Sequence, residues 1–246
     1  MSVLLLRLSG PMQSWGSRSR FTERDTEREP TKSGVIGLLC AALGKPRMEE
    51  PEDGFPALSD LAALKMGVRV DREGDVRRDY QTAGGGSWPG VKSYGVATAD
   101  GKSRKPEVSN RYYLADAVFL VGLEGSFELL SRLHRALGEP VWPLYLGRKS
   151  YVPGEPVRLA DGLLETALLT DALAKWPSLV ADRSRGRRTP DRKARFVVEC
   201  APGDDGDPRQ DVPICFRHEA REHGVRRVSQ FFAPLPKDEK EAAQCT

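Results

Sequence analysis

The sequence of 246 residues predicts a mixed α+β fold, because short apolar runs with strand-like alternation occur between segments that have helical periodicity. In chain order the expected elements are a strand, a helix, a pair of strands, a further strand, a helix and a last strand. This order resembles the β-α-β-β-α-β pattern of ferredoxin-like and RRM-type domains. We therefore expect such a domain over residues 1–155, with a long insertion, and a smaller β-rich domain over residues 156–246.

The first strand and the first helix have clear sequence signals. Residues 3–8 alternate around branched and apolar side chains, and a Ser-Gly-Pro sequence then ends the strand. After a long polar loop, the apolar repeat over residues 35–43 predicts a buried helix that ends at Gly44. Either Thr31 or Ser33 can supply its N-cap.

A hairpin and a long aperiodic segment are expected next. A short helix over residues 58–64 precedes two strands, 65–70 and 76–82, which an Asp-Arg-Glu-Gly turn joins as a hairpin. Residues 83–108 then contain a Gly-Gly-Gly run and a basic tip, and show no periodicity. A stretch of this length without secondary structure is usually functional or mobile.

The first domain is expected to end with strands on either side of a helix. Residues 112–114 and 117–123 predict two strands, and residues 127–137 predict an amphipathic helix that Gly138 closes. Residues 141–146 predict the last strand of this domain.

The C-terminal region has a different character. A helix is expected over residues 163–176, and strands over residues 196–199, 212–216 and 225–232. Between them, residues 182–195 contain seven lysines and arginines against two aspartates. Such a segment is either a solvated surface loop or an arm that contacts a phosphate backbone, and we favour the arm.

The composition excludes fibrous, membrane and disulfide-stapled classes. Apolar residues make up 39% of the chain, charged residues 30%, and the formal net charge is +3. The first apolar run, residues 3–6, is too short for a signal peptide or a spanning helix, so we expect a cytoplasmic protein. The four cysteines form no C-x-x-C pair; we expect Cys40 to be buried, and Cys200 and Cys215 to stay reduced even if adjacent strands bring them together.

The motifs that would indicate an enzyme are incomplete. Residues 101–103 read Gly-Lys-Ser, but Val96 stands where a phosphate-binding loop needs glycine, and no apolar helix follows. His218 and His223 are five positions apart, which rotates them by about 140° on a helix and prevents joint metal ligation. We therefore expect no catalytic residue, no metal and no cofactor.

Four residues near the N-terminus are candidates for contact with a nucleic acid. Trp15 can stack on a base and Gln13 can bind a base edge, although Trp15 can equally pack beneath its own loop. Lys32 and Ser33 open the first long helix, where free N–H groups, an ammonium and a hydroxyl can hold a phosphate. The alternative is ordinary helix capping.

Further basic candidates lie later in the chain. Arg148 and Lys149 follow a glycine at the end of a predicted strand, a position suited to a phosphate, although exposed pairs of this kind are often only solvated. Arg185 and Arg187 belong to the basic segment and are expected to contact the phosphate backbone.

The sequence resembles the CasD family, the Cas-five-type subunits of the type I-E CRISPR surveillance complex Cascade. The resemblance rests on short motifs that occur in family order over roughly residues 3–151: residues 11–16, 30–39, 79–82, 92–93, 111–119 and 145–150. Each motif alone is weak, and their joint order makes chance agreement improbable. Beyond residue 160 no motif supports the resemblance.

The resemblance implies a non-catalytic RNA-binding subunit that contributes to antiviral defence. Members of the family hold the 5′ handle of the CRISPR RNA and cap the Cas-seven-type backbone. They also help to seat the Cas-eight-type large subunit among the other Cascade subunits. The RRM-like domain of the family carries an extended hairpin called the thumb, which would correspond here to residues 83–108. The matching motifs add Lys92 and Arg111 to the expected RNA-binding residues.

Two other functions stay open. A metal-independent endoribonuclease that processes precursor CRISPR RNA would need acid–base groups, for which Tyr80, Lys92 and His134 are candidates. A general RNA chaperone of RRM type would bind RNA without preference for the handle sequence and would not assemble with partners.

Overall fold

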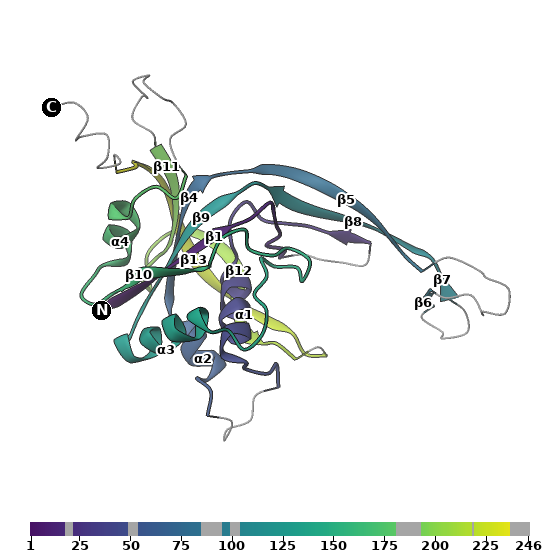
Figure 1. Cartoon of the computed structure of the whole chain (residues 1–246), viewed down its shortest axis with the longest axis horizontal. Helices are drawn as coiled ribbons and strands as arrows, with labels where there is room; N and C mark the ends of the chain where they lie inside the picture. The colour runs from purple at the N-terminus through teal and green to yellow at the C-terminus, as the bar shows by residue number, and fades with distance from the viewer. Residues whose placement is uncertain are drawn as a thin grey trace.

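The centre of the molecule is a seven-stranded sheet in which every neighbouring pair of strands is antiparallel (Figure 1). The computed structural model describes residues 1–17, 22–48, 54–84, 95–98, 104–180, 193–217 and 219–236. Across the sheet the strands are β10 (Arg158–Leu164), β1 (Ser2–Ser9), β9 (Val118–Gly125), β4 (Lys65–Arg72), β11 (Lys193–Glu199), β13 (Glu222–Pro234) and β12 (Asp207–Cys215).

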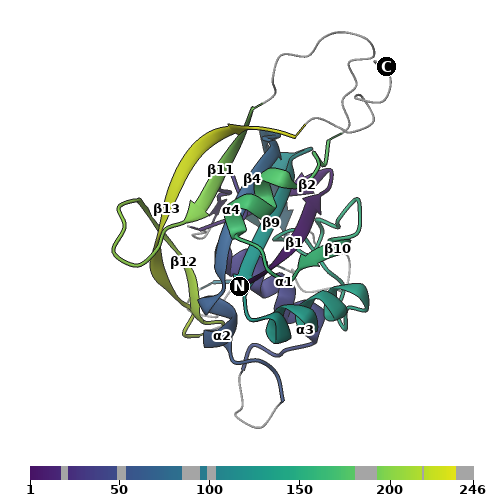
Figure 2. The ribbon, with the colours of Figure 1, turned by 90° about the vertical axis from the view of Figure 1, so that its left-hand side faces the viewer.

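Helices cover both faces of this sheet. They are α1 (Lys32–Leu43), α2 (Leu58–Ala63) and α3 (Phe127–Gly138) on one face and α4 (Leu169–Lys175) on the other. Because side chains alternate along a strand, Leu4 and Leu6 of β1 join the core beneath α1 and α3, whereas Leu5 packs towards α4. Helix α4 lies across the strands in Figure 2 and packs closely on Gly67 and Gly122, where an added Cβ would meet its leucines at 2.8 and 2.6 Å.

A second sheet forms an arm that leaves the body (Figure 1). Its long strands are β5 (Asp75–Ala83) and β8 (Glu107–Ala115), which pair antiparallel along their whole length. Near the body β8 also pairs with β2 (Met12–Gln13) and β3 (Glu23–Arg24), and β6 (Val96–Ala97) pairs with β7 (Arg104–Lys105) towards the tip. The arm is therefore an insertion between β4 and β9 of the main sheet.

Most predicted elements are confirmed, with small shifts at their ends. The first strand, the three helices α1 to α3 and the three C-terminal strands all form. Helix α1 is capped by Thr31, whose side chain accepts a hydrogen bond from the Gly34 N–H, and it ends at Gly44 with a left-handed φ of 72°. The segment expected to be the thumb lies mostly outside the described residues, but its flanking strands form the arm.

The predicted hairpin between residues 65–70 and 76–82 is wrong. The two strands form, but β5 pairs with β8 and not with β4, whose neighbours are β9 and β11. The exposure of β5 agrees with this pairing, because its side chains are mostly exposed, whereas those of β4 are buried in the main sheet.

Two further predicted elements need correction. Residues 141–146 form no strand, because Pro140 and Pro143 flank a segment whose backbone N–H groups bond to α1. The helix expected over residues 163–176 begins only at Leu169, since the preceding leucines belong to β10.

The expected domain boundary after residue 155 does not divide the sheet. Strand β10 adds to one edge beside β1, while β11, β13 and β12 extend the sheet beyond β4. The C-terminal strands thus continue the sheet of the N-terminal region, because β11 buries its apolar side chains against α4 with those of β1 and β9.

Candidate nucleic-acid interface

An open groove of about 530 Å³ runs along α1 where the arm meets the body. Five segments form it: the loop after β2, the region of β3, the exposed side of α1 with the residues that follow it, the loop after α3, and the turn between β12 and β13. Such convergence of loops on one surface is typical of a binding site.

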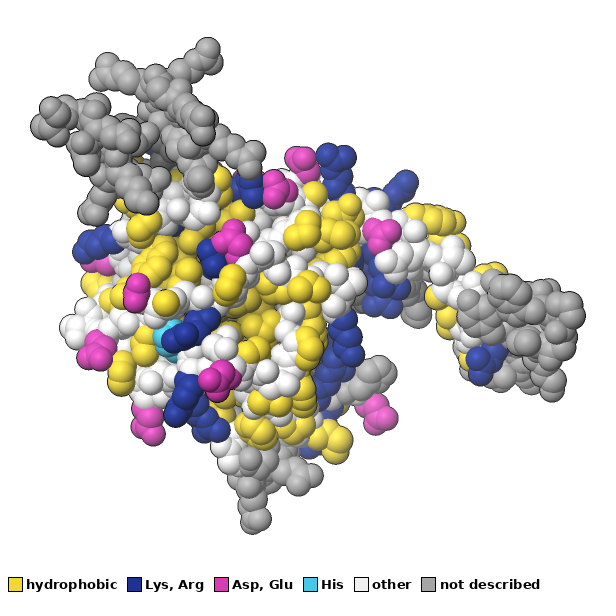
Figure 3. Space-filling model, in the orientation of Figure 1, with side chains coloured by type: hydrophobic (Ala, Val, Ile, Leu, Met, Phe, Trp, Pro, Cys, Tyr) yellow, Lys and Arg dark blue, Asp and Glu magenta, His cyan; other side chains and the backbone are white. Residues whose placement is uncertain are grey.

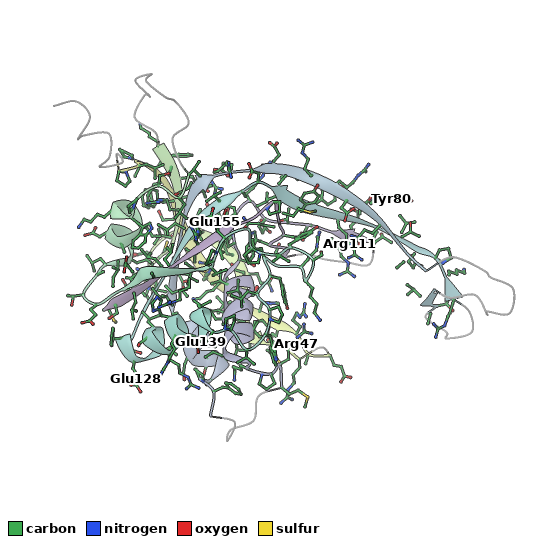
Figure 4. The ribbon with its side chains drawn as sticks, in the orientation of Figure 1. Arg47, Tyr80, Arg111, Glu128, Glu139 and Glu155 are labelled. Carbon is green, nitrogen blue, oxygen red and sulfur yellow. The ribbon has the colours of Figure 1, made fainter. Side chains whose placement is uncertain are left out.

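Cationic side chains dominate this groove. The lysines and arginines that line it are Arg24, Lys45, Arg47, Arg148 and Arg221, while Asp25 is the one carboxylate among its described lining residues. Figure 3 shows lysine and arginine side chains on this side of the body, beneath the arm. In Figure 4, Arg47 and Arg111 lie on that side, whereas Glu128 and Glu139 lie on α3, away from it. The distribution of charge favours a polyanionic ligand.

Helix α1 presents small side chains to the groove. Ser33, Gly34, Gly37 and Ala41 line it, and a Cβ added at Gly37 would meet no atom within 4 Å. A sugar or phosphate can therefore approach the helix backbone closely along this side.

Arg148 is held at the edge of the groove by its neighbours. Its guanidinium donates hydrogen bonds to the Tyr151 Oη at 2.9 Å and to the Arg24 backbone oxygen at 3.1 Å. Gly147 permits this loop to reach the β2 loop, because its φ is 90° and a Cβ there would lie 1.7 Å from the Ser14 oxygen. The side chain keeps partial exposure and adjoins the exposed Lys149, so both expected cations are accessible.

Gln13 and Trp15 are structural residues, so the expectation that they contact a base is corrected. Both are buried, with 0% and 1% of their surface exposed. The Gln13 Nε2 donates to the Leu8 and Ala117 backbone oxygens at 3.1 and 2.8 Å, and its Oε1 accepts from the Trp15 Nε1 at 3.2 Å. With its indole packed close to Gly34, Trp15 supports the groove from beneath, which is the alternative that the sequence left open.

Lys32 does not face a phosphate either. Its side chain is 1% exposed, and its Nζ donates to both carboxylate oxygens of Glu199 at 3.0 and 2.9 Å. The backbone N–H of Lys32 donates to the Asp211 Oδ2 at 2.7 Å. A carboxylate of the protein therefore occupies the helix N-terminus where the sequence suggested a phosphate. Of the expected pair, Ser33 alone lies in the groove.

The carboxylate at the α1 N-terminus belongs to a buried ionic network. Arg226 donates two hydrogen bonds to Asp211, at 2.7 and 2.9 Å. Burial disfavours the ionised Asp211, but the hydrogen bonds and charges of Arg226 and Lys32 outweigh it, so its pKa lies below the usual value. Burial lowers the pKa of Lys32, and the charge of Glu199 offsets this only in part.

The remaining expected residues are placed as follows. Arg111 lies on β8 next to Arg24 of β3, and its Nε donates to the Ser109 Oγ at 3.1 Å. Lys92, Arg185 and Arg187 lie outside the described residues. Arg195 belongs to the basic segment expected over residues 182–195, but it lies within β11, where it is nearly buried and forms ion pairs with Glu29 and Glu73. It is therefore part of the central sheet and not of a segment that is free to contact RNA.

Sequence reasoning missed several groove residues. Arg47 and Arg221 are single cations in loops, and Trp142 and Phe216 occur without a motif. Nothing local distinguishes them, because only the fold brings them together. Arg24 belongs to the long polar loop after the first strand, in which cations recur every fourth residue from Arg20 to Lys32.

Of the candidate acid–base groups, Lys92 lies outside the described residues, and Tyr80 and His134 lie on different elements. Tyr80 lies on the arm, 63% exposed, whereas His134 lies on α3 at a distance from the arm (Figures 1 and 4). In the part of the chain that the structure describes, no group of three or more His, Cys, Asp or Glu side chains is arranged to hold a metal ion. No helix there is both long and apolar enough to span a membrane.

The fold and the groove define an α+β protein with a cationic and partly aromatic groove. The family model described as "CRISPR-associated protein (Cas_Cas5)" matches residues 3–229. The chain belongs to this CRISPR-associated Cas5 family, which confirms the resemblance found in the sequence motifs.

Individual relatives agree with this assignment. The "CRISPR system Cascade subunit CasD" of Escherichia coli (strain K12) is 36% identical over 162 residues, which span 61% of this chain and 66% of that protein. A solved structure described as "Crystal structure of Cas protein" is 41% identical and covers 96% of this chain and 98% of its own, with a TM-score of 0.70. A chain of a "CRISPR RNA-guided surveillance complex" is 33% identical to this chain, and the match covers 95% of this chain and 91% of that one, with a TM-score of 0.71.

The depressed pKa of Asp211 predicts a specific loss of stability in acid. A carboxylate whose pKa is lower in the folded than in the unfolded state stabilises the fold at pH values above its pKa in the unfolded chain, which is about 4. This contribution disappears as the pH falls through the pKa of the folded state. At pH 7 we expect Asp211→Asn to reduce the free energy of unfolding by about 1.5–3 kcal/mol. Urea unfolding at a series of pH values should show this difference shrinking below pH ~4; a difference that stays constant with pH would contradict the assignment.

Proposed function

We propose that this chain is a non-catalytic RNA-binding subunit of a type I-E CRISPR surveillance complex, in which the groove along α1 holds the 5′ handle of the CRISPR RNA. The observation that carries the proposal is the groove itself, where four exposed or partly exposed arginines (Arg24, Arg47, Arg148 and Arg221) line the open, small-residue side of a helix. Single-stranded RNA is held by phosphate contacts and by stacking of unpaired bases, and this surface offers both kinds of side chain.

The covering of the central sheet supports a loop-based mode of binding. The sheet contains the strand order β10-β1-β9-β4, with α1 between β1 and β4 and α3 between β9 and β10. We propose that these elements form a ferredoxin-like core. RRM domains read RNA on the open face of such a sheet. Here α4 packs on that face and buries Leu5 and Leu120, so the RNA is held at the loops and along α1 instead.

The comparisons support the assembly part of the proposal. A relative that is 36% identical is named as a Cascade subunit, and a chain of similar fold belongs to an RNA-guided surveillance complex. We infer that this chain likewise binds a Cas-seven-type backbone subunit, a Cas-eight-type large subunit and the other Cascade subunits. In this role it contributes to antiviral defence by positioning the guide rather than by cutting it.

Charge reversal at the rim of the groove tests the proposal. Arg47 and Arg221 are exposed. Within the described residues their side chains form no hydrogen bond or ion pair that would stabilise the fold. We expect the double variant Arg47→Glu/Arg221→Glu to weaken binding of 5′-handle RNA and to reduce the slope of log K against log salt by about 1.4, or 0.7 for each lost phosphate contact. Fluorescence anisotropy between about 50 and 200 mM salt measures both quantities.

The matched control is Arg135→Glu, which reverses an exposed arginine on α3, outside the groove. It should leave the affinity and the salt slope close to those of the unmodified protein. The control changes the net charge by −2 and the double variant by −4. A loss of binding free energy in the control that is half the loss in the double variant would therefore mean that net charge, and not the groove, binds the RNA.

A bulky side chain on α1 tests the path of the RNA independently of charge. Gly37→Ala fills open space within a helix and should raise the free energy of unfolding by about 0.5–1 kcal/mol. Gly37→Leu projects into the groove and should weaken RNA binding while the protein stays folded. If Gly37→Leu binds the handle RNA as tightly as Gly37→Ala does, the RNA does not run along this helix.

The endoribonuclease alternative has a direct test. Incubation of the purified protein with repeat RNA in the presence of a chelator should leave the RNA intact, because Tyr80 lies on β5 of the arm and His134 on α3 of the body. Specific cleavage that Tyr80→Phe or His134→Ala abolishes would overturn the non-catalytic assignment.

A further inference from the structure

Trp142 is a large aromatic residue that the fold leaves exposed. Three tryptophans lie in the described part of the chain: Trp15 is 1% exposed, Trp176 is half-buried and Trp142 is 45% exposed. Because a solvent-exposed indole gives up much of the free energy that its burial would supply, a single exposed tryptophan in a groove suggests a ligand.

The backbone of Trp142 is held firmly against α1. Its N–H donates to the Ala41 oxygen at 3.1 Å, and the N–H of Val141 donates to the Ala42 oxygen at 3.0 Å. These bonds reach carbonyls at the C-terminal end of α1; the Ala41 oxygen also accepts from the Gly44 N–H at 3.2 Å. Val141 also packs on Gly44, where an added Cβ would lie 2.7 Å from its Cγ1. The indole is thus carried on a pre-organised segment.

The surroundings of Trp142 fit a base linked to phosphates better than a protein side chain. Trp142 lines the groove together with Tyr145 and Phe216, and the cations Arg47 and Arg148 line the same groove. Aromatic platforms that alternate with cations are the usual means of holding a single strand, because every base has a face that can stack. A protein ligand would have to bring an acidic surface to match these charges.

We propose that Trp142 is the stacking platform for one unpaired base of the RNA, and this rests on the proposed function. The platform would fix the register of the strand, while the neighbouring arginines hold the phosphates on either side of the stacked base. Stacking of this kind tolerates any base, so Trp142 would set position and not sequence.

The test compares Trp142→Ala and Trp142→Phe with Phe127→Ala. Phe127 is a matched control, because it is an aromatic residue with the same 45% exposure but lies at the start of α3, outside the groove. The probes are a 5′-handle RNA and a set of the same RNA carrying one abasic nucleotide at each position in turn. We expect Trp142→Ala to weaken binding by about 10- to 100-fold without changing the salt slope, and Trp142→Phe to retain most of the affinity.

The abasic series then identifies the stacked nucleotide. At one position the abasic site should weaken binding to the unmodified protein and cause no further loss in Trp142→Ala, because both changes remove the same contact. Unchanged affinity of Trp142→Ala, or a loss that is additive with every abasic site, would overturn the platform. Normal RNA binding combined with failed assembly of the complex would also overturn it, since Trp142 would then contact a protein.

Failure of the platform and failure of the proposed function give different results. If the groove does not hold RNA, Arg47→Glu/Arg221→Glu will weaken binding no more than its change in net charge accounts for, as the Arg135→Glu control measures it. If only the platform is wrong, these charge reversals will still weaken binding while Trp142→Ala does not.

Discussion

The attachment of the α1 N-terminus to a carboxylate of β12 determines the geometry on which the groove depends. Asp211 accepts the Lys32 backbone N–H, Arg226 of β13 clamps the same carboxylate, and the Lys32 side chain reaches Glu199 of β11. Charge-assisted hydrogen bonds of this kind contribute about 1.5–3 kcal/mol each. They join the helix to the C-terminal strands and so fix which side of α1 remains uncovered.

The uncovered side of α1 and the covered side of the sheet are two consequences of the same packing. Strands β11 to β13 extend the sheet of the N-terminal region, and α4 closes the face that an RRM-type domain would use for RNA. With that face buried, the proposed binding surface is formed by the loops that meet at the other side. The glycine at 147 and the backbone bonds of Val141 and Trp142 hold two of these loops against the β2 loop and α1.

Local elements could be predicted from the sequence, and long-range pairing could not. The cap at Thr31 and the end at Gly44 depend on neighbouring residues only, so the boundaries of α1 follow from local rules. The partner of β5 is β8, which follows it in the chain only after a long segment without periodicity. The turn between residues 71 and 74 wrongly suggested that β5 pairs with β4 as a hairpin. The site shows the same limit: Arg148 and Lys149 have a local signal, whereas Lys32 is removed from the surface by Glu199, 167 positions later.

The proposed path takes one RNA strand along α1 between the loops that carry Arg47, Arg148 and Arg221. Photo-crosslinking of 4-thiouridine-substituted CRISPR RNA in the purified complex, followed by mass spectrometry, identifies the peptides that the RNA contacts. We expect crosslinks from the handle nucleotides to peptides that contain the α1 start, Trp142 or Phe216. Crosslinks of the handle confined to α3, α4 or β10, with none in the groove, would contradict it.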